Sequence, residues 1–382
     1  MERKDEPSFE QAWAVNILLS NSTHIFAGGE DYVLILGTHL AKRGHRVWVS
    51  ALPGHLLLTK CAERGIDTVP IDYRGMSRVF NVSSELRAYL QRLRIDVVHS
   101  NANYDRTCAA LATALTPIHH IAGVHSAHSI QHNITHWWRN RWGTAHFITD
   151  ADAGRDVLVR EDGISPERIT TVPIGIENET EEYNERARRA IRHEWGVTDS
   201  TVVIGNVARL VEFKGHRFLL EAIALVCREY QDVFFPLVGG GELYETLTRQ
   251  ARTLNIERFI RFLGFRDNLE DIYPGFDIYC HSSLELAAEM FPIAILRALG
   301  TGLPVVCTNV GGIAGMVRDG RSGYLAPPEN PLAMAEALLK IIRDKNLRRS
   351  MGQESLALFL ERYHASAMAE AVERVYKNLS HT

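Results

Sequence analysis

The chain alternates between short apolar runs and longer segments in which hydrophobic residues recur every three or four positions. In the first half, AVNILLS (14–20), HRVWVSAL (45–52) and DVVHSN (96–101) have the composition of buried strands. YVLILGTHLAKRG (32–44) and SSELRAYLQRLR (83–94), which lie among them, have helical periodicity. This alternation predicts an α/β fold with a parallel sheet and helices on both of its faces.

The same alternation starts again in the second half of the chain. TVVIGNVARL (201–210) and VFFPLVGGG (233–241) are predicted strands, and HRFLLEAIALVCREY (216–230) between them is a predicted helix. A charge-rich segment, 177–198, separates the two series, and a single amphipathic helix is predicted for about 356–379. Two Rossmann-like domains are therefore expected, with ligands outside the carboxyl ends of the strands.

Composition fits a globular protein of about two domains, with 382 residues, 46% hydrophobic and 23% charged. A formal net charge of −4 argues against a nucleic-acid partner. The start, MERKDEPSFE, is too polar for a signal peptide, and no apolar run reaches about 18 residues. The five cysteines are widely spaced, without a CxxC pair, which favours packed thiols, a cytoplasmic setting and no metal site.

The stretch 281–313 has the most informative pattern. It predicts a loop, a helix with Pro292 in its first turn, and a short strand, PVVCT. Glu289 then lies just outside the helix N-terminus, whose N–H groups and dipole favour an anion. A carboxylate here is suited to hold hydroxyl groups beside a bound phosphate. The alternative is that Glu289 only caps the helix.

Other candidate groups also follow predicted strands. Arg209 lies at the carboxyl end of the predicted strand 201–210 and Lys214 follows it, where two cations suit an anion, although they are also consistent with solvated loop residues. His125 ends another predicted strand, and a structural role is its alternative. Gly28 and Gly29 lie in a predicted loop after the first strand, where glycine allows close approach to a ligand or simply makes a turn.

Several of these motifs resemble those of one family. Glu289-Met-Phe-Pro-Ile-Ala-Ile-Leu-Arg297 is similar to the E-x7-E signature of the family 4 retaining glycosyltransferases, "glycosyl transferases group 1". VARLVEFKG (207–215) resembles the family's G-R-L-x-x-x-K-G element, and Gly28-Gly29-Glu30 resembles its GG-x-E loop. The resemblance covers almost the whole chain. It implies the GT-B fold, with two Rossmann-like domains facing across a cleft and a C-terminal helix crossing back to the N-terminal domain.

The resemblance also implies the domain boundaries and the roles of individual residues. Residues 1–176 would form the acceptor-binding domain, 177–355 the nucleotide-sugar-binding domain, and 356–382 the returning helix. Catalytic roles would fall to Glu289, His125, Arg209 and Lys214. Donor-binding roles would fall to Gly28, Gly29, Gly239, Phe265, Arg266, Phe291, Pro292, Ile293 and Arg297.

The activity that the resemblance implies is transfer of a hexose from a nucleotide diphosphate sugar to a hydroxyl group, with retention of configuration. The acceptor would be a glycan, a glycolipid or a small molecule, as in polysaccharide biosynthesis, and neither a metal nor another cofactor would take part. The alternative is a non-catalytic subunit of the same fold that binds a nucleotide sugar. An epimerase or hydrolase with this fold is a third interpretation that little in the sequence favours.

Two positions depart from the family pattern. Arg297 stands where the family has its second glutamate, which holds the ribose, and a guanidinium can only donate hydrogen bonds. Ile313-Ala314-Gly315 follows Gly311-Gly312, where the family often has x-P-E. Donor choice or activity is therefore expected to differ from the family pattern.

The segment HWWRNRWG (136–143) combines three tryptophans with arginines. Such a mixture suits a membrane interface or an amphiphilic acceptor, so a cytoplasmic protein attached to the inner face of the membrane is expected. The alternative is a packed aromatic helix whose arginines extend to solvent.

Overall fold

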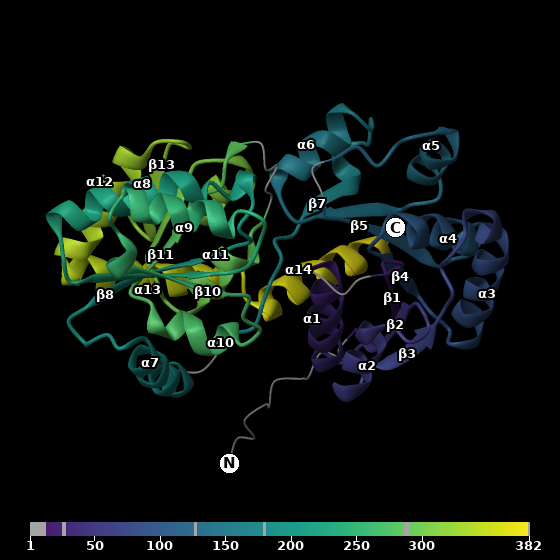
Figure 1. Ribbon diagram of the computed structural model, residues 1–382. Helices are drawn as coiled ribbons and strands as arrows, with labels where there is room; N and C mark the ends of the chain where they lie inside the picture. Colours follow the sequence, from purple (N-terminus) through teal and green to yellow (C-terminus); the bar gives the residue numbers. More distant parts are fainter. Residues whose placement is uncertain (1–12, 25–27, 126–127, 179–180, 286–290, 381–382) are drawn as a thin grey trace, which may run out of the picture. The chain divides into compact units, whose positions relative to one another are not determined.

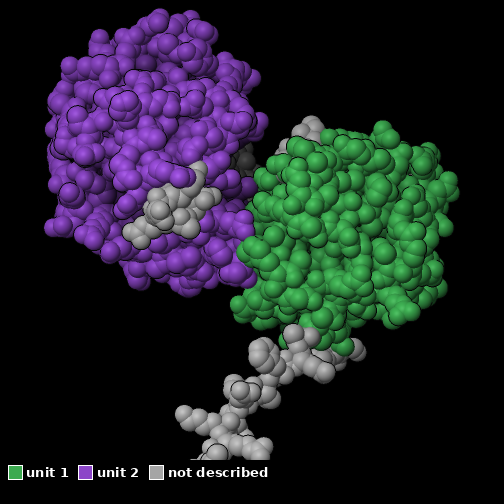
Figure 2. Space-filling model, turned by 90° about the horizontal axis from the view of Figure 1, so that it is seen from below, with its two compact units in different colours: residues 1–173, 368–382 green, residues 174–367 purple. Residues whose placement is uncertain are grey.

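The computed structural model describes residues 13–24, 28–125, 128–178, 181–285 and 291–380 (Figure 1). The chain divides into two compact units, coloured separately in Figure 2. Unit 1 consists of Met1–Pro173 with Met368–Thr382, and unit 2 consists of Ile174–Ala367. Glu289 lies outside the described residues.

Unit 1 is built on a seven-stranded sheet in the order β3-β2-β1-β4-β5-β6-β7, and each neighbouring pair is parallel. The order reverses between β1 and β4, which makes their carboxyl ends the expected ligand edge. The strands are β1 (Asn16–Ser20), β2 (Arg46–Ala51), β3 (Asp67–Pro70), β4 (Val97–Ser100), β5 (His119–Val124), β6 (His146–Thr149) and β7 (Ile169–Thr171).

Helices connect these strands. Because parallel crossovers are right-handed, the direction of each crossover along the sheet decides which face its helix covers. Buried residues of α3 and α4 form one core with the strands. The helices of unit 1 are α1 (Gly28–Lys42), α2 (Leu56–Glu63), α3 (Val79–Arg92), α4 (Asn103–Thr113), α5 (Ile134–Arg141), α6 (Asp152–Arg160) and α14 (Ala365–Ser380).

The last helix, α14, belongs to unit 1 although unit 2 precedes it in the sequence. The Tyr376 side chain is fully buried, and its hydroxyl lies 2.7 Å from Nδ1 of His99 on β4. Arg43, which follows α1, donates from Nε to the Glu373 carboxylate at 2.7 Å. The C-terminal helix therefore completes the core of the N-terminal unit.

Unit 2 has a six-stranded parallel sheet in the order β10-β9-β8-β11-β12-β13, which reverses between β8 and β11. Helices α8, α9 and α12 share a core with the strands, and α11 packs against α13. The strands are β8 (Val202–Val207), β9 (Val233–Val238), β10 (Ile260–Gly264), β11 (Ile278–His281), β12 (Val305–Thr308) and β13 (Gly323–Ala326). The helices are α7 (Glu181–Trp195), α8 (His216–Glu229), α9 (Tyr244–Thr253), α10 (Leu269–Ile272), α11 (Ile293–Gly300), α12 (Pro331–Arg343) and α13 (Lys345–Arg362).

The chain passes between the units twice, after Pro173 and after Ala367. Within unit 2, the segments next to these crossings run side by side. The Ile176 N–H donates to the Tyr363 carbonyl oxygen at 2.9 Å, and the Ala365 N–H donates to the Ile176 carbonyl oxygen at 3.0 Å. The two crossings are thus hydrogen-bonded to each other at their unit 2 end.

The α/β architecture predicted from the alternating pattern is confirmed, and the structure corrects or adds to the predictions in four details. The predicted loop at Gly28 and Gly29 is the first turn of α1, where Glu30 and Asp31 suit the helix dipole. Pro292 is the N-cap of α11 and precedes its first turn. The charge-rich segment 177–198 contains a full helix, α7.

The fourth detail is a correction: the single helix predicted at about 356–379 is two helices, α13 and α14. The chain leaves the helical conformation at Tyr363, where the Ile176 segment takes its carbonyl group as a hydrogen-bond acceptor. A long-range backbone contact therefore replaces the local hydrogen bonds that would continue the helix.

All five cysteines lie in the described part of the chain, and each is buried and free of disulfide bonds. None of the described helices combines the length and apolar character that crossing a bilayer requires.

We predict that Tyr376→Phe lowers the free energy of unfolding by about 1–3 kcal/mol, because it leaves Nδ1 of the buried His99 without its hydrogen-bond partner. Urea unfolding followed by circular dichroism measures the change. The control is Tyr324→Phe on β13, a half-buried tyrosine, which should change stability by less than about 0.5 kcal/mol. Equal effects of the two substitutions would contradict a specific role for the α14 hydroxyl.

Candidate functional site

Three loops at the carboxyl edge of unit 2 are joined through their backbones. The Leu210 N–H, after β8, donates to the Gly240 carbonyl oxygen at 2.9 Å, and the Gly239 N–H donates to the Gly264 carbonyl oxygen at 2.8 Å. Gly239 has φ +135°, and a Cβ built on it would lie 2.0 Å from the Ala208 carbonyl oxygen. Only glycine allows this approach, so Gly239 is needed to form the edge itself.

Lys214 lies where the strand order of unit 2 reverses. The short helix Glu212–Lys214 follows β8, and the segment after β11 holds its backbone. The Ser282 hydroxyl donates to the Lys214 carbonyl oxygen at 2.8 Å, and the Leu284 N–H donates to the Phe213 carbonyl oxygen at 2.8 Å. Hydrogen bonds from the β11 side thus fix the loop that carries the lysine.

Arg209 and Lys214 share one aromatic ring. The Arg209 guanidinium carbon lies 5.7 Å from the centroid of the Phe213 ring, and the Lys214 ammonium nitrogen lies 5.5 Å from it. Arg209 is exposed and Lys214 is partly buried. Burial, and secondarily the neighbouring Arg209 charge, lower the pKa of Lys214 to about 8. The ring therefore holds two cations together at the sheet edge.

Neutral imidazoles lie behind this cation pair. His216 Nε2 lies 3.1 Å from Oδ1 of Asn206, whose amide donates to the Cys280 carbonyl oxygen at 2.9 Å. Burial, helped by Lys214, lowers the pKa of His216 to about 4, and burial also lowers the pKa of His281. Both rings are neutral at physiological pH, so Arg209 and Lys214 dominate the positive charge here.

Helix α11 begins close in sequence to this edge, with Pro292 as N-cap and Ile293 as its first residue. No acidic residue occupies its first turn. The Phe291 ring lies against Tyr363, with ring centroids 5.6 Å apart. The positive end of the α11 dipole therefore lacks an acidic partner in its own first turn.

Two of the predicted donor-binding residues, Phe265 and Arg266, follow β10. Phe265 is a large apolar side chain that is 81% exposed. The Arg266 guanidinium donates to the Glu194 carboxylate on α7 at 2.7 Å. An exposed aromatic ring thus stands next to a cation that already has an acidic partner.

Arg297, the departure from the family pattern, lies one turn into α11. Its side chain lines a small cavity of about 30 Å³ together with Glu177, Glu270 and Tyr273. Burial raises the pKa of Tyr273, and the Arg297 charge opposes that shift. The residues that line this cavity therefore include two glutamates as well as the arginine.

In unit 1, His125 follows β5 at the carboxyl edge of the sheet. Its Nε2 lies 3.3 Å from Asn101 Oδ1, and its Nδ1 lies 3.7 Å from Asp150 Oδ2. The Tyr32 ring of α1 packs on the imidazole, with centroids 4.4 Å apart. The sequence analysis missed Asn101, Asp150 and Tyr32. The first two follow β4 and β6, so their positions at strand ends were the available signal.

His99, which ends the predicted strand DVVHSN, has a structural role. It is fully buried, and burial lowers its pKa to about 3. Near the same edge, Gly28 and Gly29 open α1, and Glu30 in its first turn accepts a hydrogen bond from the Thr23 hydroxyl.

Comparison with known proteins identifies the family of the chain. Residues 26–180 match the profile described as "Glycosyltransferase Family 4", and residues 187–357 match "Glycosyl transferases group 1". The D-inositol 3-phosphate glycosyltransferase of Corynebacterium urealyticum is 29% identical over 395 residues, which cover 92% of this chain and 91% of the relative.

Solved structures share the fold. A glycosyltransferase from Rickettsia africae superimposes with a TM-score of 0.82 at 17% identity, covering 96% of this chain and 98% of that chain. Anabaena HepE, in complex with UDP-glucose, gives a TM-score of 0.74 at 18% identity, covering 95% and 100%. With the GT-B fold and both family profiles present, the chain belongs to the family 4 glycosyltransferases.

Proposed function

We propose that the protein transfers a hexose from a nucleoside diphosphate sugar to an acceptor hydroxyl group, with retention of configuration. The observation that carries the proposal is the pair Arg209 and Lys214, held over Phe213 where the strand order of unit 2 reverses. A leaving diphosphate gains negative charge as the sugar bond breaks, and fixed cations at that point lower the barrier.

The charge in unit 2 suits a reaction without a metal or another cofactor. The Arg209 guanidinium can donate two parallel hydrogen bonds, and the Lys214 ammonium group is a compact positive charge. The N-terminus of α11 adds the positive end of the helix dipole. These groups supply to a diphosphate the positive charge that a metal ion supplies in other transferases. They bind the leaving group rather than the sugar.

The sugar needs a separate set of contacts. We assign Glu289 to accept hydrogen bonds from donor hydroxyl groups and His125 to orient the sugar, with Asp150 and Asn101 beside the imidazole. In the proposed step the bond from C1 to the phosphate oxygen breaks. A bond from C1 to the acceptor oxygen forms on the same face, and the acceptor proton passes to the leaving phosphate.

The proposed acceptor is a hydroxyl group of a glycan, a glycolipid or a small molecule. The corynebacterial relative is a D-inositol 3-phosphate glycosyltransferase. A phosphorylated cyclitol is therefore the first acceptor to test.

Arg297 supports a second candidate, a non-catalytic subunit that binds a nucleotide sugar. A guanidinium cannot accept the hydrogen bonds of ribose hydroxyl groups. Arg297 also lines the cavity that contains Glu177 and Glu270. Binding of a nucleotide sugar without turnover would favour this candidate.

A membrane-associated acceptor is consistent with the surface of α5. Ile134 is 76% exposed and Trp142 is 68% exposed, with the Arg141 guanidinium 5.3 Å from the Trp142 ring. The alternative, in which the arginines of this segment extend to solvent, is wrong for Arg139, which is buried, whereas Arg141 is exposed. We propose that the exposed rings insert at the interface of a bilayer.

The first test of the proposed function is nucleoside diphosphate release from UDP-, GDP- and ADP-hexoses, with D-inositol 3-phosphate as the acceptor. We expect one donor to react and Arg209→Ala to lower kcat by about 100-fold or more. Glu289→Ala should abolish release, and Arg297→Glu should change the preferred nucleotide. The control Arg249→Ala, at an exposed arginine of α9, should leave the rate unchanged. Binding without release would overturn the transferase assignment.

A second prediction concerns pH. Lys214 is protonated below its lowered pKa of about 8, so diphosphate affinity should be full below pH 8 and decline above it. Calorimetry with the preferred nucleoside diphosphate between pH 7 and 9.5 should record a fall of up to about tenfold. Lys214→Arg should remove this dependence, because a guanidinium stays charged. A decline that persists in this variant would assign the dependence to another group.

A third prediction concerns α5. Trp137→Ala combined with Trp142→Ala should lower binding to anionic phospholipid vesicles by about tenfold or more, because two exposed rings are lost. Vesicle sedimentation measures the bound fraction. Phe80→Ala combined with Tyr244→Ala removes two other exposed rings and should have no effect. Unchanged binding of the tryptophan variant would reject the membrane contact.

A further inference from the structure

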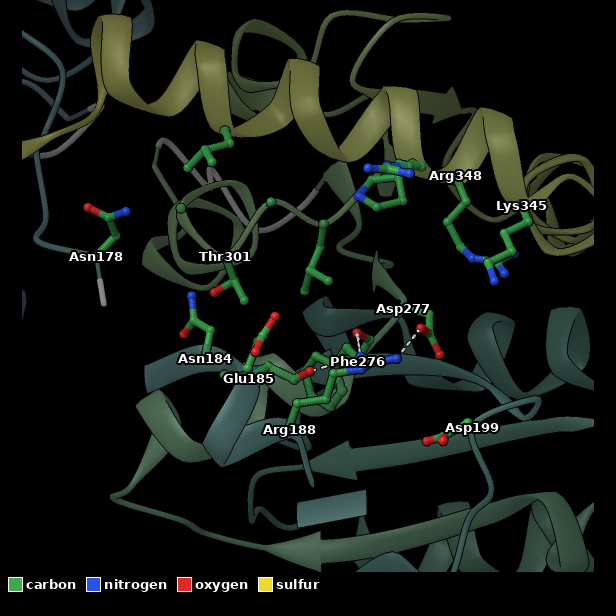
Figure 3. A pocket seen from close by; sticks show the side chains of 17 residues that line it. Asn178, Asn184, Glu185, Arg188, Asp199, Phe276, Asp277, Thr301, Lys345 and Arg348 are labelled. Carbon is green, nitrogen blue, oxygen red and sulfur yellow. Dashed lines mark hydrogen bonds and ion pairs between the residues drawn. The ribbon is translucent and has the colours of Figure 1, made fainter. Parts of the chain in front are cut away.

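A pocket of about 620 Å³ opens at the amino edge of the unit 2 sheet (Figure 3). It is lined by Asp277, which precedes β11, by Pro304, which precedes β12, and by residues of α13. Arg209 and Lys214 follow the carboxyl end of β8, at the opposite edge of the same sheet. The pocket is therefore separate from the candidate donor site.

One wall of the pocket is cationic. Lys345, Arg348 and Arg349 occupy the first turns of α13, and their spacing places them on one side of the helix. The Arg348 guanidinium donates to the carbonyl oxygens of Ile341 and Ile342 at 2.9 and 3.1 Å, which fixes it at the C-terminus of α12. Within the described ranges no carboxylate lies at ion-pair distance from any of these three cations.

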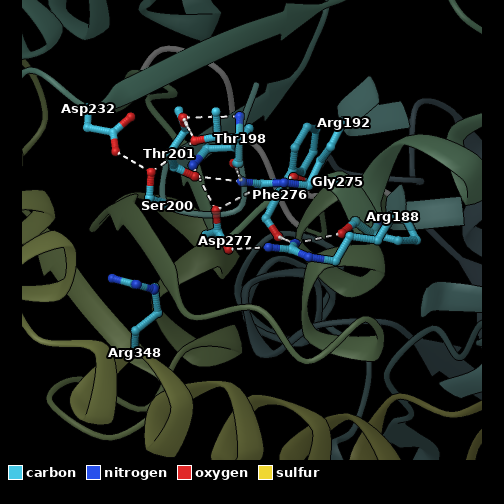
Figure 4. Close-up of polar contacts among 12 residues, drawn as sticks. Arg188, Arg192, Thr198, Ser200, Thr201, Asp232, Gly275, Phe276, Asp277 and Arg348 are labelled. Atoms are coloured by element: carbon cyan, nitrogen blue, oxygen red, sulfur yellow. Dashed lines mark hydrogen bonds and ion pairs between the residues drawn. The ribbon is translucent and has the colours of Figure 1, made fainter. Parts of the chain in front are cut away.

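The carboxylate in the pocket floor is already neutralised. Asp277 accepts from Arg188 at 2.6 Å and from Arg192 at 3.0 Å, as Figure 4 shows. It also accepts from the Val203 N–H at 2.8 Å. With two arginines bound, Asp277 does not cancel the charge of the α13 wall. Arg188 is held further by the Pro274 carbonyl oxygen at 2.9 Å.

The other end of the pocket carries uncharged polar groups and one acid. Asn178, Asn184, Thr301 and Glu185 gather there, away from Lys345 and Arg348 (Figure 3). Amides, a hydroxyl and a carboxylate are groups that bind sugar hydroxyls. A further acid, Asp199, also lines the pocket.

We infer that this pocket binds a small phosphorylated polyol or sugar. Its phosphate contacts Lys345, Arg348 and Arg349, because guanidinium groups pair with phosphate through two parallel hydrogen bonds. Its hydroxyl groups contact Asn178, Asn184 and Glu185. The volume falls within the range of small-molecule sites, and a nonpolar wall that includes Phe276 and Leu356 can cover the carbon skeleton.

Calorimetric titration of the whole chain with glucose 6-phosphate and with inorganic phosphate tests the inference. We expect the ester to bind more tightly than phosphate. Lys345→Gln combined with Arg349→Gln should weaken both by about 100-fold or more, because two charge-assisted contacts with the phosphate are lost. Asn184→Ala should weaken only the ester. Equal affinities for ester and phosphate would overturn the assignment of the hydroxyl end.

Two controls separate this pocket from general charge and from the donor site. Arg228→Gln combined with Arg249→Gln removes two exposed cations elsewhere in unit 2 and should leave binding intact. Arg209→Ala combined with Lys214→Ala should also leave it intact, whether or not the proposed transferase activity is found. Loss of binding in either control pair, or no binding by the unaltered protein, would overturn the inference.

Arg348 needs a variant of its own, because its hydrogen bonds to the end of α12 support the fold. Arg348→Lys keeps the positive charge but removes the planar guanidinium group, which can donate two parallel hydrogen bonds to a phosphate. It should weaken the ester by about tenfold while the thermal unfolding midpoint falls only slightly. Unchanged affinity in this variant would contradict direct contact between Arg348 and the phosphate.

Discussion

The neighbouring strands of both sheets run in parallel, and this constraint decides where polar chemistry can lie. Parallel strands need crossover connections, whose helices cover the faces of the sheet. Charged groups that bind ligands are therefore expected at the two ends of the strands, where helices do not cover the sheet. In unit 2 cations gather at both ends of the strands, because Arg209 and Lys214 follow the carboxyl end of β8 while Lys345 and Arg349 line a pocket at the amino ends. The sheet keeps the two groups of cations apart.

Glycines make the carboxyl edge possible, and they explain part of the motif. Gly239 faces the Ala208 carbonyl oxygen, and Gly215, with φ +64°, faces the Ser282 carbonyl oxygen. A side chain at either position would separate loops that must touch. The glycine that ends VARLVEFKG is therefore required for the loops after β8 and β11 to pack together. The same contact between the loops fixes the position of the lysine that precedes this glycine.

The sequence predicted the elements whose signals are local, and it failed where distant backbone takes part. Strand and helix periodicity located β8 and the cations that follow it. Phe213 beneath those cations has no distinctive spacing, and Asp150 reaches His125 only through the pairing of β5 with β6. The break between α13 and α14 depends on Ile176, almost 200 residues earlier. The local sequence has helical periodicity on both sides of the break, so it predicted one continuous helix. Such contacts are properties of the topology rather than of any short segment.

The position of α14 has a consequence for the order of synthesis. Most of unit 1 precedes unit 2 in the chain, yet the buried Tyr376 that completes its core is synthesised only after the whole of unit 2. At about 5–20 residues per second, synthesis of Ile174–Ala367 occupies roughly 10–40 s, during which the surface that α14 will cover faces solvent. A chain that terminates early in unit 2 therefore damages both units, and the nascent protein exposes this surface of unit 1 until α14 has been synthesised.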